Sequence, residues 1–348
     1  MGDKVWRGSR SFLALGLLAI AVSGAAAVGP AQALVINPTF DSSINSRADA
    51  QQIKSAFNTA AAAYTSNLTD QVIINIQVSW GSVGGYAMPY GALGASLDPL
   101  YGYYSYAQIK SWLKADATSS SDATAIANLP VVSPAGNRFV VPKGEAKALG
   151  LIPGSGTSID GYIGFGNGVS YDYTPGNGIT AGAYDFTTVA AHEIDEVLGR
   201  ISGLNSPSAS WATPFDLFRC SGGGRSFSYF AAAYFSIDGC KTNLGNFNNV
   251  GGGDRSDWAS GPDGVDVQNA YLYPGHASGL SAADLIALDV IGWGGANTNL
   301  GSLAPSSLVV IGLNGVPAPE PSSLLLLLSG LTGLAGITWR RCRRSPDR

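Results

Sequence analysis

Residues 183–200 limit what this chain can fold into more than any other segment. They read Ala-Tyr-Asp-Phe-Thr-Thr-Val-Ala-Ala-His-Glu-Ile-Asp-Glu-Val-Leu-Gly-Arg. Asp185 can cap the N-terminus of a helix, and Gly199 suits the position just beyond its C-terminus. The apolar residues recur at the spacing of one helix face: Val189, Ile194, Val197 and Leu198. The segment therefore predicts an amphipathic helix with a histidine and three acidic residues near its end.

The spacing of these polar residues predicts a metal site. A residue four positions on in a helix is rotated by only ~40°, so His192 and Glu196 face one point in space. Glu193 can lie beside that point, as the general base does in zinc hydrolases. Asp195 is also near the His192 face, so spacing alone does not exclude it as the second ligand. The alternative is a helix end whose charged residues serve only solubility.

The surroundings of this helix resemble metzincin zinc peptidases. His192 to Ser202 is similar to their motif H-E-x-x-H-x-x-G-x-x-H, and the Tyr-Asp-Phe-Thr-Thr-Val-Ala lead-in is similar to matrixin active-site helices. A helix, a strand ending in Trp-Gly and the segment Ile-Asp-Gly-Tyr-Ile-Gly-Phe precede it in matching order. Tyr-Leu-Tyr-Pro at 271–274 and a helix at 280–293 follow, like a Met-turn and final helix. The likeness covers about residues 48–293.

This resemblance implies an α/β (α+β) fold of the zincin type for residues 34–296. We expect a small twisted mixed sheet with the His192 helix along the floor of a cleft. Residues 159–165 would be an edge strand that binds an extended substrate by strand addition. Zn²⁺ would be the cofactor, with His192 and Glu196 as ligands. A carboxylate ligand lowers the net charge of the site, so we expect activity toward alkaline pH.

Three positions depart from the family pattern. Glu196 stands at the second ligand position, Ser202 at the third, and Leu272 where the family has methionine. The third ligand must come from elsewhere, or there is none. Asp216, a lone carboxylate between apolar residues, is the first candidate, with pairing to a neighbour or capping of a turn as the alternative.

One other residue on the chain could supply that ligand. His276 is the second candidate, although an exposed loop histidine is an equal reading. Asp254 and Asp257, in Gly-Gly-Asp-Arg-Ser-Asp-Trp, are interpreted as a turn or a calcium-binding loop, and their spacing is too irregular to assign the calcium-binding loop.

The periodicity and the turn residues predict the remaining elements only in outline. Residues 81–104, rich in Gly, Tyr and Pro, read as a long loop or a short hairpin. The segment 203–279 suggests weak β-hairpins. We expect helices at 48–64, 106–115, 122–129, 145–149 and 280–291, and strands at 71–80 and 159–165.

Both chain ends carry targeting signals. Residues 1–33 have three basic residues, an apolar run and a small-x-small site, and predict a secretory signal peptide cut by signal peptidase. Without the ends, the chain has 12 Lys and Arg against 21 Asp and Glu. A nucleic-acid partner is not expected, because phosphate binding needs a cationic face. Export favours a disulfide between Cys220 and Cys240 over two free thiols.

The C-terminal end has a second resemblance. After a linker at 297–315, residues 316–348 contain Pro319, Glu320 and Pro321, an apolar segment at 324–339 and a basic tail. This arrangement resembles the PEP-CTERM sorting signal of Gram-negative bacteria. It implies a transient membrane-spanning stage, cleavage by an exosortase near Pro319 to Pro321, and release to the cell envelope or extracellular matrix. A plain membrane anchor is the alternative.

Together these observations predict an exported zinc endopeptidase that hydrolyses peptide bonds, with a protein or peptide as substrate. The alternative is a structural or exopolymer-binding matrix protein with a zincin shell and no activity.

Overall fold

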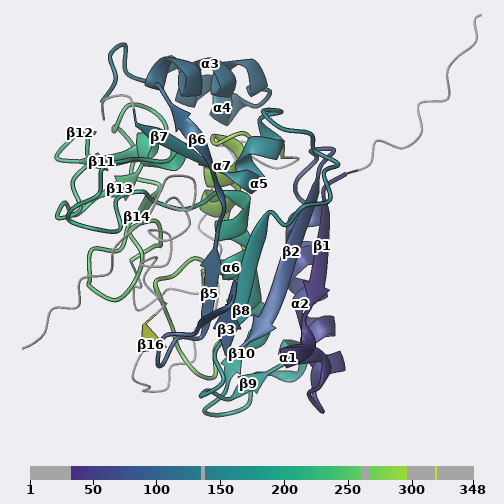
Figure 1. The fold of residues 1–348 in the computed structure, drawn as a ribbon. Helices are drawn as coiled ribbons and strands as arrows, with labels where there is room; N and C mark the ends of the chain where they lie inside the picture. The colour runs from purple at the N-terminus through teal and green to yellow at the C-terminus, as the bar shows by residue number, and fades with distance from the viewer. Residues whose placement is uncertain (1–32, 135–137, 260–265, 296–317, 320–348) are drawn as a thin grey trace, which may run out of the picture. The chain divides into compact units, whose positions relative to one another are not determined.

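The computed structural model describes residues 33–134, 138–259, 266–295 and 318–319 (Figure 1). The predicted signal peptide up to residue 32, the whole linker at 297–315, and nearly all of the sorting signal with its apolar segment at 324–339 lie outside these residues. Within them, no helix is both long enough and apolar enough to cross a membrane.

The main sheet has four strands in the order β1-β2-β8-β5 (Figure 1). They are β1 (Val35–Phe40), β2 (Ile73–Trp80), β8 (Gly161–Phe165) and β5 (Gly94–Leu97). β1, β2 and β8 run parallel, while β5 pairs antiparallel with β8. The prediction of a mixed α/β fold with a small mixed sheet is therefore confirmed.

The prediction that residues 159–165 form an edge strand is wrong. Residues 159–165 contain β8, which has β2 on one side and β5 on the other, so β8 is an interior strand. β5 is the edge strand on that side of the sheet, with β1 at the other edge, and it lies in the segment 81–104 that the sequence predicted as a loop or short hairpin. Its sequence Gly-Ala-Ser-Leu has no β-branched or aromatic residue, so the usual strand signal is missing.

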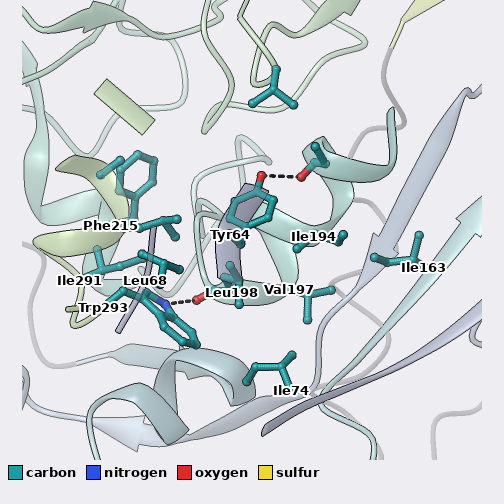
Figure 2. Close-up of a cluster of buried hydrophobic side chains, with 14 of the residues drawn as sticks. Tyr64, Leu68, Ile74, Ile163, Ile194, Val197, Leu198, Phe215, Ile291 and Trp293 are labelled. Atoms are coloured by element: carbon teal, nitrogen blue, oxygen red, sulfur yellow. Dashed lines mark hydrogen bonds between the residues drawn. The ribbon is translucent and has the colours of Figure 1, made fainter. Parts of the chain in front are cut away.

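The helix with the polar residues packs against the sheet. α6 (Phe186–Leu198) contacts β5 and β8, as well as α2 (Ala50–Thr65) and α5 (Lys143–Ala148). Figure 2 shows the core between these elements, where apolar side chains of α6 lie among those of α2, β2 and β8. Two buried hydrogen bonds fix α6 there: Tyr64 Oη donates to Ala191 O at 2.6 Å, and Trp293 Nε1 donates to Leu198 O at 2.7 Å.

The other elements of the first two thirds of the chain are short. The helices predicted at 106–115 and 122–129 correspond to α3 (Tyr106–Asp116) and α4 (Ser120–Ala127). The remaining elements are one short α-helix, one 3₁₀ helix and several small strands: α1 (Ser42–Asn45), β3 (Ser82–Val83), β4 (Tyr86–Ala87), β6 (Leu100–Tyr104), β7 (Phe139–Pro142), β9 (Tyr171–Asp172), η1 (Pro175–Asn177) and β10 (Tyr184–Asp185).

The C-terminal third forms a second small sheet, in the region where the sequence suggested hairpins. Its order is β12-β11-β13-β14. The predicted disulfide is formed and joins Cys220 of β11 to Cys240 in the loop between β13 and β14, with a Cα–Cα distance of 5.6 Å. The elements of this third are η2 (Pro214–Phe218), β11 (Arg219–Ser221), β12 (Gly224–Arg225), β13 (Tyr234–Phe235), β14 (Gly245–Asn246), β15 (Tyr271–Leu272), α7 (Ala282–Asp289) and β16 (Ala318–Pro319), which pairs with β15.

Candidate metal centre

The ends of α6 are fixed by the two residues that the sequence indicated. The Asp185 carboxylate accepts hydrogen bonds from the main-chain N–H groups of Thr187 and Thr188, which satisfies donors in the first turn. Gly199 has φ +118°, a conformation that side chains disfavour, and it ends the helix. The turn that carries His192, Glu193 and Glu196 is consequently held in one position and buried.

Three potential metal ligands converge at the end of this helix. His192 Nε2 lies 4.0 Å from Glu196 Oε1 and 3.9 Å from Asp257 Oδ1. One ligand atom of each residue lies within 4.8 Å of those of the other two, a spacing that suits a shared cation. Two of the three residues are those the helical spacing predicted, and the third comes from a loop between β14 and β15.

The ring of His192 is oriented for ligation. Its Nδ1 lies 2.9 Å from the carbonyl oxygen of Val267, which can only accept, so Nδ1 carries a proton in that hydrogen bond. Burial lowers the pKa of His192 to about 4, so the ring is neutral at physiological pH. The lone pair on Nε2 therefore faces the two carboxylates.

Asp257 is held in place by its burial and by contacts of its own loop. It is fully buried, and its Oδ2 accepts a hydrogen bond from the main-chain N–H of Asp254 at 3.0 Å. The next residue, Trp258, stacks on Phe247 and donates through Nε1 to Asp284 at 2.8 Å. Within the described part of the chain, Asp257 Oδ1 has no hydrogen-bond donor, and it is the atom that faces His192.

Asp195 points to a different environment. Its carboxylate pairs with Arg200 Nε at 3.7 Å, and Arg200 also lies 3.9 Å from Asp284 and over the ring of Trp258. Arg200 further donates to Gln268, whose side-chain amide donates to the carbonyl oxygen of His192. The structure thus brings Glu196, and not Asp195, to His192.

The site concentrates buried negative charge. Burial, followed by the charges of Glu193, Asp254 and Asp257, holds the pKa of Glu196 well above its usual range. Burial also raises the pKa of Asp257 to about 6, although Arg200 opposes this rise. A cation at the convergence point would offset the repulsion and return these carboxyls to their ionised form.

The two third-ligand candidates named from the sequence lie elsewhere. Asp216 is the acceptor of a capping arrangement: Ser202 Oγ donates to it at 2.5 Å, and the N–H groups of Gly203 and Thr213 donate at 2.9 Å. This is the turn-capping alternative, and Ser202, at the family's third ligand position, serves the same turn. His276 lies in the loop after β15, against the ring of Tyr273, and neither residue joins the group around His192.

Asp257 was the residue that sequence reasoning interpreted differently. It is separated from Glu196 by a long Gly-rich stretch, and its Asp-Trp neighbourhood reads as a turn. The only signal in the sequence was the combination of a carboxylate with a large aromatic residue in an otherwise small and polar segment.

The donor set fits a divalent cation. One neutral imidazole and two carboxylates are chemically ordinary ligands of Zn²⁺, and a three-residue set leaves a coordination position open for reactants. Asp257 Oδ1 is buried without a hydrogen-bond donor among the described residues. This is the environment expected of a ligand atom.

Comparison of the chain with known protein families gives a match at its C-terminal end alone. Residues 317–344 match the family model of the PEP-CTERM protein-sorting motif, which confirms the predicted sorting signal. This motif implies processing by an exosortase and export with membrane-anchored sorting to the cell surface. No curated protein and no solved structure matches the chain significantly.

Proposed function

We propose that the exported domain is a zinc-dependent endopeptidase of metzincin-like type. The observation that carries this proposal is the convergence of His192 Nε2, Glu196 Oε1 and Asp257 Oδ1 at the end of α6. The resemblance of the helix and its surroundings to metzincins supports the reaction class. It does so although Glu196 and Ser202 stand where the family has its second and third histidine ligands.

Glu193 is the proposed general base. It follows His192 on α6, is buried, and lies against β5, where Gly94 leaves room for its side chain. Its charge acts on Glu196, so the carboxylate is close to the ligand group without belonging to it. A base in that position is within reach of a water molecule that the ligand group would present.

β5 replaces residues 159–165 as the proposed substrate-binding strand. Gly166 N donates to Leu93 O, while Phe165 O accepts from Gly81 on the opposite side of β8. Leu93 and, by alternation, Ala95 and Leu97 therefore bond to β8. The N–H and C=O groups of Gly94 and Ser96 point away from β8, to the side on which no other described strand pairs with β5. Ser96 is partly exposed there, and an extended peptide can add as a strand on this side.

The reaction follows from these placements. Zn²⁺ at the ligand group would supply Lewis acidity, polarising the substrate carbonyl and making a water molecule more acidic. Glu193 takes a proton from that water as the water oxygen bonds to the carbonyl carbon. Glu193 then gives the proton to the amide nitrogen as the C–N bond breaks, so the products are a carboxylic acid and an amine. His192 remains neutral throughout, because burial lowers its pKa to about 4, and the hydrogen bond to Val267 fixes which ring nitrogen carries the proton.

The test is the metal content and activity of the exported protein, purified without chelator. We expect about one zinc per chain and cleavage of an unbiased peptide library, with the cleaved bonds read by mass spectrometry from neutral to alkaline pH. A protein that neither binds zinc stoichiometrically nor cleaves any peptide would instead support the non-catalytic matrix protein.

A further inference from the structure

We infer that Gly94 of β5 is a positioning residue for Glu193; the inference rests on the proposed function. A Cβ atom at residue 94 would lie 2.7 Å from Glu193 Cδ and 2.8 Å from Cγ, with Oε1 closer still. Real Cβ atoms essentially never come this near to other heavy atoms. The glutamate can hold its present conformation only while residue 94 has no side chain.

The strand geometry explains why the clash is with Glu193. Side chains alternate between the two faces of a strand. Ala95 and Leu97 pack with Val83 on the face away from α6, so Gly94 and Ser96 face α6. Ser96 is turned toward Asp98, to which its hydroxyl donates at 2.8 Å. Gly94 is thus the position over which the Glu193 carboxylate lies.

The main-chain groups of the same residue point away from β8, to the unpaired side of β5. Gly94 therefore links two requirements of hydrolysis: the place of the base and the place of the peptide bond beside it. A methyl group at position 94 would turn the Glu193 side chain from Cγ outward and carry the carboxylate away from the edge. Displacement of a catalytic group by ~1 Å can cost ~100-fold in rate.

A purely structural role is the competing explanation. Other glycines approach α6 closely without involving Glu193: a Cβ at Gly161 would lie 2.5 Å from the Val197 side chain. If Gly94 served backbone packing alone, the effect of replacing it would not depend on the side chain at 193. A double-mutant cycle separates the two roles without any need for activity.

The cycle compares Gly94→Ala in the wild-type background with the same change in Glu193→Ala. In the wild-type background we expect Tm to fall by about 2–8 °C, as overpacking usually causes in a domain of this size. In the Glu193→Ala background we expect a fall of less than about 2 °C, since the clashing side chain is gone. Gly161→Ala, as the matched clash, should lower Tm equally in both backgrounds.

The effect of Gly94 on catalysis is measured separately, through zinc content and kcat. Gly94→Ala should keep its zinc, because Glu193 is not in the ligand group, while kcat falls by at least ~100-fold. Gly168→Ala, which places its methyl group in open space, is the activity control. If Gly94→Ala does not fold, recovery of folding in Gly94→Ala/Glu193→Ala supports the inference.

If Gly94→Ala lowers Tm equally in both backgrounds, or leaves kcat unchanged, Gly94 does not position Glu193 and the inference is wrong. If the wild type cleaves no peptide, the proposed function fails by itself. The stability cycle then still decides whether Gly94 positions Glu193.

Discussion

His192 Nδ1 donates a hydrogen bond to the main-chain oxygen of Val267, 2.9 Å away and 75 residues further along the chain. This contact fixes which ring nitrogen is protonated and which one faces Glu196 and Asp257. The next residue, Gln268, donates to the carbonyl oxygen of His192, so one short segment holds both the backbone and the ring of the histidine. The loop that precedes β15 is thus as much a part of the site as the helix.

Asp257 is expected to be the third metal ligand. Asp257→Ala removes a ligand atom, so zinc affinity should fall by at least ~100-fold while the protein stays folded. Isothermal titration with Zn²⁺, together with circular dichroism, would measure this.

Asp216→Asn and His276→Ala provide the contrast, because both residues lie outside the ligand group. Asp216→Asn should lower stability through the turn it caps and leave the zinc stoichiometry of the folded protein unchanged. Loss of zinc from either of these variants, with retention in Asp257→Ala, would contradict the assignment.

The helix that carries the site was predictable because the residues that determine its ends and its buried face are neighbours in the sequence. Asp185, Gly199 and the apolar face fix the ends and the buried side of α6, and the four-residue spacing of His192 and Glu196 fixes their common direction. The exclusion of Asp195 was not predictable. It depends on Arg200, which is buried beside Trp258 and Asp284, and these contacts are long-range.

The third ligand and the edge strand depend on tertiary contacts in the same way. Asp257 reaches His192 because Trp258 packs into the core, and no spacing rule connects position 257 with position 192. β5 is only four residues long, has weak strand propensity, and exists because β8 offers it a free edge. Sequence periodicity detects neither of these.

Asp98 makes stability depend on pH in a defined direction. Burial raises its pKa from 3.8 to about 7, so between these values the folded state holds a proton that the unfolded state has lost. The contribution of Asp98 to stability therefore falls as pH rises through this window. Asp98→Asn removes the titration and should be more stable than the wild type above pH ~7, by up to ~4 kcal/mol.

The measurement is urea unfolding of both proteins, with chelator present, at pH ~5 and pH ~8. Comparing the two proteins at each pH cancels the opposite contribution of His192. The pKa of His192 is lowered to about 4, so its contribution falls as pH drops through the window from 6.5 to 4. A stability difference that is the same at both pH values would refute the role of Asp98.

The disulfide between Cys220 and Cys240 should be present in the exported protein. It closes a loop with a sequence separation of 20, so replacing both cysteines by alanine should cost ~2–4 kcal/mol in unfolding free energy. Peptide mapping by mass spectrometry after alkylation, with and without reductant, tests the bond. Alkylation of both cysteines without reductant would show that it does not form.

Processing of the C-terminus should require Glu320. The residue lies in the segment that matches the PEP-CTERM protein-sorting motif, which implies processing by an exosortase. In a host with the sorting enzyme, Glu320→Ala should accumulate as a longer, membrane-associated form. Intact mass and cell fractionation measure this, and normal release with the usual mass would argue against the role of Glu320.

Glu193 is the proposed base of a metal-dependent peptide hydrolysis, and the variant Glu193→Gln isolates this role. Glutamine keeps the shape of the side chain and removes its basicity, so the variant should bind zinc like the wild type while kcat falls by at least ~100-fold. Zinc content and peptide cleavage are measured on the same preparation of both proteins. Full zinc occupancy with undiminished cleavage by Glu193→Gln would show that Glu193 is not the base.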